Sequence, residues 1–255
     1  MVLAVAVLLA DNYQFNMIVV LTGAGISKES GIATFRDSDG LWANYRIEEV
    51  CTPEALARDR AKVIGFYNER RKELLEKQPN AAHYALAELA KVKDVRIITQ
   101  NIDDLHELAG SKDVVHLHGE MCKLRSSRNE LATVDIKDWR KDPDSWRQDM
   151  ETRHPDGTLL RPYVVFFGEG VPMMDEAVKI AQQADIFVII GSSLNVYPAA
   201  SLANFVRPGV PIYIVDPADP ANVKSSYISN PITYIQKKAS EGIPELVEKL
   251  KKQDF

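Results

Sequence analysis

Small and polar residues that suit phosphate binding follow the first apolar run of this sequence. Thr22-Gly23-Ala24-Gly25-Ile26-Ser27 comes directly after residues 17–21. Glycines between a strand and a helix let the backbone approach a diphosphate, whose charge the free amides at the helix start stabilise. A tight turn without a ligand is the alternative. A dehydrogenase motif is not favoured, because Lys28 stands where its third glycine is required.

Two further segments carry groups that suit the same kind of ligand. Gly191-Ser192-Ser193-Leu194 follows the apolar run 186–190 and offers hydroxyls and amides to a phosphate or a ribose. Residues 31–42 predict a mobile lid, with Phe35 as an apolar cover and Arg36 as an anion contact. An ordinary surface loop explains residues 31–42 equally well.

Candidate catalytic groups follow the apolar runs 95–98 and 114–115. In Gln100-Asn101-Ile102-Asp103, the carboxylate of Asp103 is suited to accept from a carboxamide NH2 group, while Asn101 orients a hydroxyl or a water. Helix capping is the alternative, although capping alone does not require three polar side chains. We predict His118 as a general base and His116 as structural, because the other histidines lack the spacing of a metal site.

An arginine lies within an apolar helical stripe. Val63, Phe66, Tyr67, Arg70 and Leu74 recur at the spacing of one helix face. A charge on such a face needs a partner, and Tyr67 is placed to donate to the same anion. An acidic ligand group is one interpretation, and a salt bridge to one of the 36 acidic residues is the other. The residues alone favour the salt bridge.

The apolar runs that precede these groups predict the fold. Short β-branched runs alternate with helical stretches at residues 17–21, 95–99, 114–117, 163–167, 186–190, 211–215 and 232–235. Several are apolar on both faces, which is typical of parallel strands joined by right-handed helical crossovers. We predict an α/β fold with a doubly wound parallel sheet, whose ligand lies beyond the carboxyl ends of the strands.

Two stretches interrupt the alternation. Residues 47–78 form a long helical run, and residues 120–161 are polar, with Trp139 and Trp146 as their main bulky apolar groups. We expect these stretches to form a smaller inserted lobe. The large lobe is then expected to comprise residues 17–46, 79–119 and 162–255. Residues 1–16 are left as an N-terminal extension, either packed on the domain or upstream of the true start.

Composition excludes several classes of protein. The 255 residues have a formal net charge of −5, so no bulk positive field favours nucleic acid as a partner. Cys51 and Cys122 form no CxxC pattern, which favours a reducing compartment, the cytoplasm. The apolar residues 2–10 are too few to span a bilayer and follow no basic residue, so we expect neither a membrane anchor nor export. We expect a monomer.

Taken together, six motifs in this order resemble the sirtuins. They are Gly23-Ala24-Gly25-Ile26-Ser27, Gly31-Ile32-Ala33-Thr34-Phe35-Arg36, Gln100-Asn101-Ile102-Asp103, His118-Gly119, Val164-Val165-Phe166-Phe167-Gly168-Glu169 and Gly191-Ser192-Ser193-Leu194. The resemblance extends from Met17 to about Leu250. It implies an NAD-dependent protein-lysine deacylase with a Rossmann-like large lobe and a small lobe.

The resemblance also implies where NAD binds. The implied contacts are Gly23, Ala24, Gly25, Ile32, Ala33, Phe35, Arg36, Trp42, Gln100, Asn101, Ile102, Asp103, Gly191, Ser192, Ser193, Val215, Asp216 and Ala239. The implied catalytic residues are His118, Asn101 and Asp103, with His118 as a general base that acts through the ribose hydroxyls. The implied products are nicotinamide, O-acyl-ADP-ribose and free lysine.

For the acyl-lysine substrate, the resemblance implies strand pairing with Val165, Phe166, Phe167, Gly168 and Glu169. Tyr67 and Arg70 match a Tyr-x-x-Arg pattern that marks sirtuins preferring succinyl, malonyl or glutaryl groups. This gives Arg70 an anionic partner and reverses the preference for a salt bridge. Cys51 corresponds to a small residue that lines a roomy acyl pocket, and some deacetylase activity is expected.

The sequence departs from the sirtuin pattern in two places. The positions aligned with the usual zinc cysteines are Ser126, Asn129, Arg153 and Asp156, so we predict a zinc-free small lobe held by apolar packing around the two tryptophans. Ile214 replaces a usual asparagine, which puts a contact to the adenosine end in doubt. Mono-ADP-ribosyl transfer and a non-catalytic NAD or acyl-peptide binding module are the alternatives to deacylation.

Overall fold

The computed structural model describes residues 17–33, 45–142, 144–223 and 225–252. The expectations for the extension 1–16 and for Phe35, Arg36 and Trp42 therefore lie outside the described residues. Within the described ranges, no helix is both long and apolar enough to cross a bilayer. Both cysteines, Cys51 and Cys122, are free thiols.

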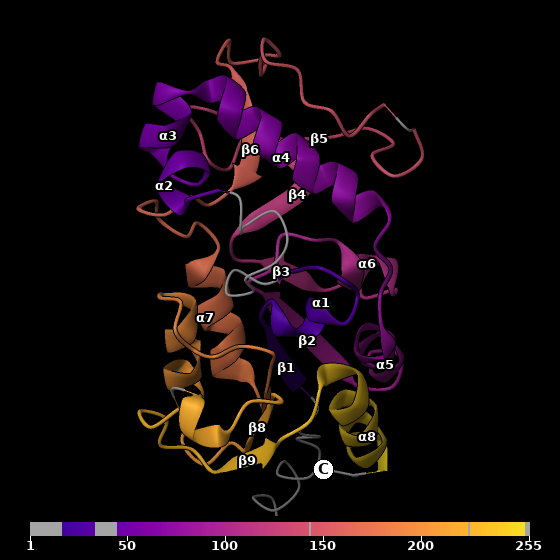
Figure 1. Cartoon of the computed structure of the whole chain (residues 1–255). Coiled ribbons are helices and arrows are strands. Elements are labelled where there is room, and N and C mark those ends of the chain that lie inside the picture. Colours follow the sequence, from indigo (N-terminus) through magenta and orange to yellow (C-terminus); the bar gives the residue numbers. More distant parts are fainter. Residues whose placement is uncertain (1–16, 34–44, 143, 224, 253–255) are drawn as a thin grey trace, which may run out of the picture.

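A six-stranded parallel sheet organises the larger part of the structure (Figure 1). Its strands are β1 (Met17–Thr22), β2 (Asp94–Thr99), β3 (Val114–His116), β7 (Ile186–Ile190), β8 (Ile212–Val215) and β9 (Ile232–Ile235). They lie in the order β3-β2-β1-β7-β8-β9, and every neighbouring pair is parallel. The order reverses between β1 and β7, which is where an open sheet of this kind binds its ligand. The predicted doubly wound parallel sheet is confirmed.

Both faces of this sheet are covered, as Figure 1 shows. Val19 and Leu21 of β1 pack on one side against α7 (Met174–Gln183) and a 3₁₀ helix (Ala199–Phe205). Ile18 and Val20 pack on the other side against α5 (Ala81–Leu89) and α8 (Ala239–Lys252). Strands buried on both faces need no polar alternation, which explains the continuous apolar runs in the sequence.

A second, smaller part lies at the other end of the molecule in Figure 1. Its elements are α2 (Ile47–Val50), α3 (Pro53–Arg58), α4 (Arg60–Leu75), β4 (Gly119–Ser126), β5 (Thr133–Asp135) and β6 (Leu160–Val164). The three strands form an antiparallel sheet in the order β5-β4-β6. The predicted helical run 47–78 is broken into separate helices, because Thr52 caps α3 ahead of Pro53 and Asp59 caps α4.

The expectation that residues 163–167 form a strand of the parallel sheet is wrong. The strand at this place is β6, which ends at Val164 and pairs antiparallel with β4. β6 is buried along its whole length, like the parallel strands, so an apolar run could not distinguish the two sheets. The polar stretch 120–161 also contributes most of β4 and the whole of β5, neither of which the sequence predicted.

One apolar cluster holds the smaller part together and joins it to the larger. Phe66 and Tyr67 of α4 pack there with Phe166, and Trp139 is buried among them. Trp146 packs against the same cluster, as expected. The cluster also includes Ile32 and Leu105 from the larger part. The division into two lobes at the predicted boundaries stays a prediction.

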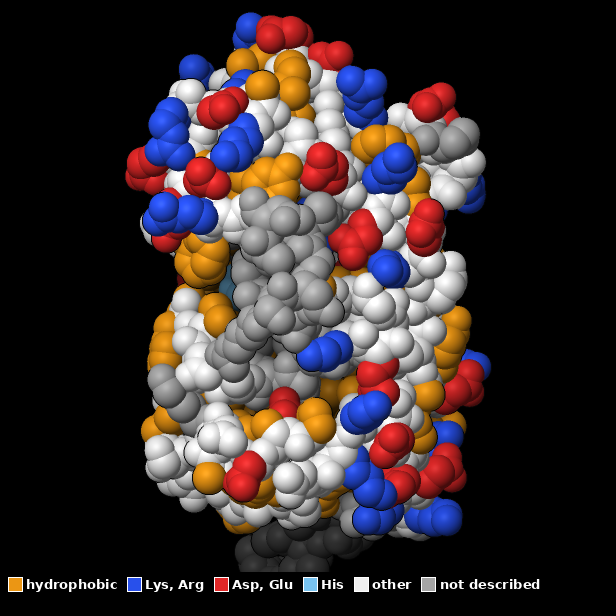
Figure 2. Space-filling model, in the orientation of Figure 1, with side chains coloured by type: hydrophobic (Ala, Val, Ile, Leu, Met, Phe, Trp, Pro, Cys, Tyr) orange, Lys and Arg blue, Asp and Glu red, His pale blue; other side chains and the backbone are white. Residues whose placement is uncertain are grey.

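The surface carries charges of both signs. On the face shown in Figure 2, Lys and Arg side chains are interspersed with Asp and Glu over both parts of the molecule. This mixture accords with the small net charge of −5.

Candidate active site

Three glycines meet where the strand order reverses. Gly23 and Gly25 follow β1, Gly191 follows β7, and the Gly25 amide donates to the Gly191 carbonyl oxygen at 2.9 Å. A Cβ on Gly25 would lie 2.6 Å from the Gly191 Cα, and one on Gly23 would lie 2.7 Å from the Gly191 oxygen. Gly191 itself has φ +57°. Backbone packing therefore requires the glycines at Gly23 and Gly25 even before any ligand is considered.

Backbone donors with no acceptor lie at this crossing. Within the described ranges, the amides of Ala24, Ser192 and Ser193 have no hydrogen-bond acceptor. Helix α1 (Gly25–Lys28) has only four residues, so its dipole contributes little and the free amides are the stronger anion-binding feature. Amide donors on two adjacent loops at the sheet's switch point fit the diphosphate of NAD.

The predicted carboxamide-binding residues converge on one serine. Ser27 Oγ donates to Asp103 Oδ2 at 3.0 Å and accepts from Asn101 Nδ2 at 3.1 Å. All three side chains are buried. The other Asp103 oxygen accepts from the Leu105 amide at 3.2 Å, at the start of α6 (Leu105–Leu108). The capping alternative thus describes one oxygen of Asp103, while the other faces the polar cluster.

Burial shifts the ionisation of Asp103 towards neutrality. Desolvation raises the pKa of the Asp103 carboxyl to about 6, against the opposing effect of the hydrogen bonds from Leu105 and Ser27. The group is a carboxylate at neutral pH and accepts hydrogen bonds, whereas below its pKa it carries a proton.

The predicted base, His118, has a defined tautomer. Its Nδ1 lies 2.9 Å from the carbonyl oxygen of Gln100. A carbonyl oxygen only accepts, so Nδ1 carries the proton and Nε2 keeps its lone pair. Burial lowers the pKa of His118, and the bond to Gln100 offsets only part of this effect. His118 is therefore neutral at physiological pH, with Nε2 ready to accept a proton.

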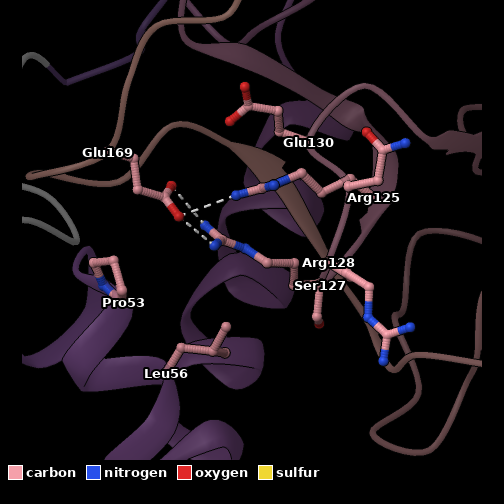
Figure 3. A pocket seen from close by; sticks show the side chains of 9 residues that line it. Pro53, Leu56, Arg125, Ser127, Arg128, Glu130 and Glu169 are labelled. Atoms are coloured by element: carbon pink, nitrogen blue, oxygen red, sulfur yellow. Dashed lines mark hydrogen bonds and ion pairs between the residues drawn. The ribbon is translucent and has the colours of Figure 1, made fainter.

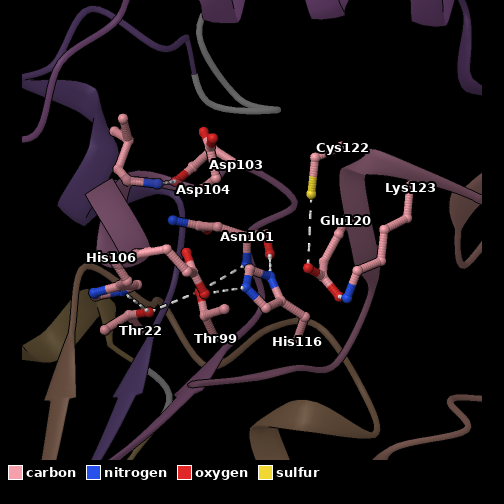
Figure 4. Close-up of polar contacts among 12 residues, drawn as sticks. Thr22, Thr99, Asn101, Asp103, Asp104, His106, His116, Glu120, Cys122 and Lys123 are labelled. Carbon is pink, nitrogen blue, oxygen red and sulfur yellow. Dashed lines mark hydrogen bonds and ion pairs between the residues drawn. The ribbon is translucent and has the colours of Figure 1, made fainter. Parts of the chain in front are cut away.

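His116 supports the neighbouring loop. Its Nδ1 lies 3.1 Å from the Asn101 carbonyl oxygen and its Nε2 lies 2.9 Å from Glu107 Oε1. Both partners are acceptors, so both ring nitrogens are donors. Burial alone would lower the pKa of His116, but the hydrogen bond and charge of Glu107 outweigh it and the pKa is raised. Figure 4 shows the bond to Asn101, which supports the predicted structural role.

Other residues predicted to contact NAD lie along the same edge or beside it. Gln100 Nε2 donates to Ser192 Oγ at 3.0 Å and so links the loops after β2 and β7. The Val215 carbonyl oxygen accepts from the Gly191 amide at 3.0 Å, and Ala239 begins α8. Asp216 accepts from the Ala218 amide at 2.8 Å. Ile32 and Ile102 pack at the apolar cluster of the smaller part, and Ala33 and Ser193 are half-buried.

The predicted peptide-binding segment runs between the base and the acyl-pocket residues. The Val165 amide donates to the His118 carbonyl oxygen and the Phe167 amide to the Cys51 carbonyl oxygen, each at 2.9 Å. Phe166 is buried, whereas Phe167 and Gly168 are exposed. The structure therefore brings His118, Cys51 and residues 165–168 together, although they are far apart in the sequence.

Helix α4 directs the Tyr-x-x-Arg pair towards this place. The Tyr67 hydroxyl donates to Cys51 Sγ at 3.3 Å, and its ring stacks on Phe166 with centroids 5.8 Å apart. The side chain of Arg70 is only 7% exposed and Nη1 contacts Glu73 Oε2 at 3.1 Å. Burial lowers the pKa of Arg70, while the charges of Glu73, Tyr67 and Asp103 raise it. Arg70 thus makes the internal salt bridge and also lies within electrostatic reach of the Asp103 loop.

Hydrogen bonds connect several of the positions aligned with zinc cysteines. Ser126 Oγ donates to Asp156 Oδ2 at 2.5 Å and accepts from the Asn129 amide at 3.2 Å. Arg153 Nη1 donates to the Gly157 carbonyl oxygen at 2.9 Å. The residues that the structure describes contain no group of three or more His, Cys, Asp or Glu side chains arranged to hold a metal ion.

The sequence analysis missed several residues that support the site. Ser27 joins Asn101 to Asp103, and its place at the start of the first helix could have indicated this role. A buried chain of hydrogen bonds links His106, Thr22 and Thr99, and the Thr99 hydroxyl accepts from the Asn101 amide (Figure 4). No periodic signal marks these residues, because their partners come from different strands.

Comparisons with known proteins give the same assignment. The model of the Sir2 family matches residues 23–198. The chain is 52% identical over 233 residues to an NAD-dependent protein deacylase of Bacteroides thetaiotaomicron, covering 91% of this chain and 97% of that protein. It is 44% identical over 233 residues to an NAD-dependent protein deacylase of Helicobacter pylori, covering 91% and 96%.

Solved structures agree with the sequence relatives. A Sir2 homologue in complex with NAD superposes with a TM-score of 0.79 at 38% identity, covering 92% of this chain and 90% of that one. A Sir2 homologue with a deacetylated p53 peptide and 3'-O-acetyl ADP-ribose gives a TM-score of 0.74 at 32% identity, covering 92% and 94%. The chain therefore belongs to the Sir2 family.

Proposed function

We propose that this NAD-dependent protein deacylase acts on lysine side chains whose acyl group ends in a carboxylate, such as succinyl or malonyl, and retains some activity on acetyl-lysine. The observation that carries the proposal is the position of Arg70. The Arg70 side chain is only 7% exposed, lies on the same helix as Tyr67 and interacts by charge with Tyr67 and Asp103, so it is suited to hold an anion close to the reacting groups.

Because Arg70 is buried, its charge can distinguish an anionic acyl group from an uncharged one. A cation shielded from water attracts an anion more strongly than an exposed one, and an uncharged acyl group gains nothing from it. Glu73, which now contacts Arg70, is partly exposed at 26% and can return to water when a ligand carboxylate replaces it. The Tyr67 hydroxyl is the second donor on the same helix turn. Cys51 Sγ accepts from this hydroxyl, and the small Cys51 side chain would leave room for the acyl chain.

The proposed roles on the NAD side follow from the donors and acceptors at the sheet edge. When bound, NAD supplies an activated ribose carbon that the acyl oxygen attacks as nicotinamide leaves. The free amides of Ala24, Ser192 and Ser193 would hold the diphosphate. Asp103 and Asn101 would hold the nicotinamide carboxamide, for which a buried acceptor beside a buried amide is suited.

His118 is proposed as the base. Its Nδ1 proton is held by the Gln100 carbonyl, so Nε2 is the nitrogen that takes the proton from a ribose hydroxyl. The hydroxyl so activated would attack the acyl carbon, and His118 would pass the proton to the departing lysine amine. One water would be consumed as the acyl group moves to ADP-ribose. The products are nicotinamide, O-acyl-ADP-ribose and free lysine.

Mass spectrometry of matched peptides tests the proposal. One peptide sequence is prepared with succinyl-, butyryl- and acetyl-lysine and incubated with the protein in the presence and absence of NAD. Butyryl and succinyl have the same number of carbons, so their comparison isolates the terminal carboxylate. We expect NAD-dependent removal of succinyl to exceed that of butyryl, and His118→Ala to abolish both. Equal rates for the two acyl groups would refute the carboxylate preference, and an ADP-ribosylated peptide would indicate transferase chemistry instead.

A further inference from the structure

A polar pocket lies at the end of the proposed peptide-binding segment, where Glu169 contributes to its lining. Its volume is about 580 Å³, and its lining comes from α3, from β4 and the residues that follow it, from β6 and from the end of the peptide-binding segment. Figure 3 shows Arg125 and Glu169 pointing towards one another across it, with Pro53 and Leu56 of α3 on one side. None of the NAD-binding or catalytic residues proposed above lines this pocket.

The buried wall of the pocket carries more positive than negative charge. Arg125 and Arg161 are 8% and 4% exposed and share the single carboxylate of Glu169. Glu169 Oε1 accepts from Arg125 at 3.0 Å and from Arg161 at 2.6 Å, while Oε2 accepts from Arg161 at 3.1 Å and from the Phe166 amide at 2.8 Å. The carboxylate is therefore fully occupied. One positive charge remains unbalanced in this pair of arginines.

Two further signs indicate that the positive charge is undercompensated. Arg161 Nε is a buried donor without an acceptor among the described residues. Burial, followed by repulsion from Arg161, lowers the pKa of Arg125, and the charges of Glu169 and Glu130 offset only part of this effect. Two buried guanidinium groups that repel one another are stabilised by any anion that approaches them.

The mouth of the pocket adds one more arginine and one acidic residue. The side chain of Arg128 is exposed and forms no ion pair with the residues that the structure describes. Glu130 is also exposed and also lines the pocket. With Arg125, Arg128 and Arg161 against Glu130 and Glu169, the lining has an excess of one positive charge.

We propose that this pocket binds an acidic side chain, aspartate or glutamate, of the polypeptide that carries the acyl-lysine. The inference rests on the proposed function, because it takes residues 165–169 as the segment that pairs with the substrate backbone. A paired strand advances about 3.3 Å per residue, so residues that flank the lysine would pass close to Glu169, which lines the pocket. Pro53 and Leu56 provide an apolar side for the methylene groups of such a side chain, and the arginines provide donors for its carboxylate.

Phe166 connects this pocket to the acyl site. The Arg161 guanidinium carbon lies 3.8 Å from the centroid of the Phe166 ring, and Tyr67 stacks on the same ring. An anion that binds to Arg161 therefore binds to the guanidinium that packs on Phe166, the same ring on which Tyr67 of the acyl pocket stacks.

Peptides that differ in one charge test the inference. A succinyl-lysine peptide series carries a single Glu at successive positions on either side of the lysine, each matched with a Gln peptide. We expect the Glu peptide to have a higher kcat/KM by about two- to fivefold at one or two positions, through a lower KM, as is typical of a partly exposed ion pair. Arg128→Gln should bring the ratio of kcat/KM for the Glu peptide to that for the Gln peptide close to one, and Glu130→Gln should increase this ratio. Arg147→Gln, which removes an exposed charge of the same lobe outside the pocket, is the matched control.

The outcomes separate this inference from the proposed function. Two results would show that the inference is wrong while the deacylase proposal stands. Succinyl-lysine is processed, but the Glu to Gln ratio of kcat/KM stays near one at every position, or this ratio is unchanged by both pocket variants. If no peptide is deacylated, fluorescence anisotropy of labelled Glu and Gln peptides still measures the charge preference. Inorganic phosphate is the probe for a free anion. Stabilisation by phosphate that depends on Arg128, without a peptide preference, would overturn the peptide assignment.

Discussion

Replacement of Arg70 by methionine is the sharpest test of acyl specificity. Methionine keeps an unbranched apolar stem in the buried position and removes only the charge and its donors. Tyr67 should keep its packing, because its ring stacks on Phe166 and its hydroxyl bonds to Cys51. Glu73 loses its partner but is 26% exposed and can be solvated.

The expected magnitude follows from the burial of Arg70. A hydrogen bond to a charged group contributes about 1.5–3 kcal/mol, which corresponds to about 10- to 160-fold in kcat/KM. The substrate carboxylate must displace Glu73 from Arg70, so we expect the lower part of this range, about 10- to 50-fold, for succinyl-lysine. Butyryl-lysine has no carboxylate, and its kcat/KM should change by less than about threefold.

Steady-state kinetics on the matched peptides, with product quantified by mass spectrometry, measures both effects. Glu73→Gln serves as the reciprocal variant: it removes the competing carboxylate and should raise kcat/KM for succinyl-lysine relative to butyryl-lysine. A parallel loss on both peptides in Arg70→Met, with a lowered melting temperature, would refute the reasoning. Arg70 would then be a structural residue whose partner is Glu73.

Three further predictions concern the base, the zinc positions and the glycine crossing. The kcat/KM should rise with pH and level off near neutrality, because His118, whose pKa burial lowers from the usual histidine value, must lose its proton and Asp103 ionises at about 6; a midpoint well above 7 would contradict both assignments. Chelation of metals should leave the melting temperature unchanged, and stoichiometric zinc found by elemental analysis would contradict the prediction of a zinc-free lobe. Ser126→Ala should destabilise the fold by about 1–2 kcal/mol in denaturant unfolding, because hydrogen bonds are lost. Gly25→Ala should reduce NAD affinity and stability together, since its Cβ would lie 2.6 Å from the Gly191 Cα, while Gly65→Ala, with open space around it, is the control; unchanged calorimetric NAD binding in Gly25→Ala would show that the crossing tolerates a side chain.

The parallel sheet and its ligand-binding edge were predictable from local patterns. Runs apolar on both faces mark strands covered by helices, and a glycine turn after the first run marks the switch point. The antiparallel sheet was not predictable in this way. β6 is as apolar as the parallel strands, and β4 and β5 lie in a stretch whose polar composition indicates no strand. Strand pairing depends on long-range contacts that periodicity does not encode.

The candidate site was also predictable only in part. The types and order of the motif residues were enough to predict NAD use, a histidine base and an anionic acyl group. The hydrogen-bond partners of those residues were not predictable. Asp103 accepts from Ser27, His118 donates to the Gln100 carbonyl oxygen, and Arg70 donates to Glu73. The pairing of Arg125 and Arg161 with Glu169 was likewise not predictable, because 44 and eight positions separate the two arginines from Glu169 in the chain.

The sequence by itself determined the family, the Rossmann-like sheet and the residues that can do chemistry, because these depend on residue type and on spacing within single elements. Only the tertiary structure decided the tautomer of His118, the raised pKa of Asp103 and the surplus charge beside Glu169. Each of these depends on burial and on a partner from another element, and both arise only when distant segments pack together.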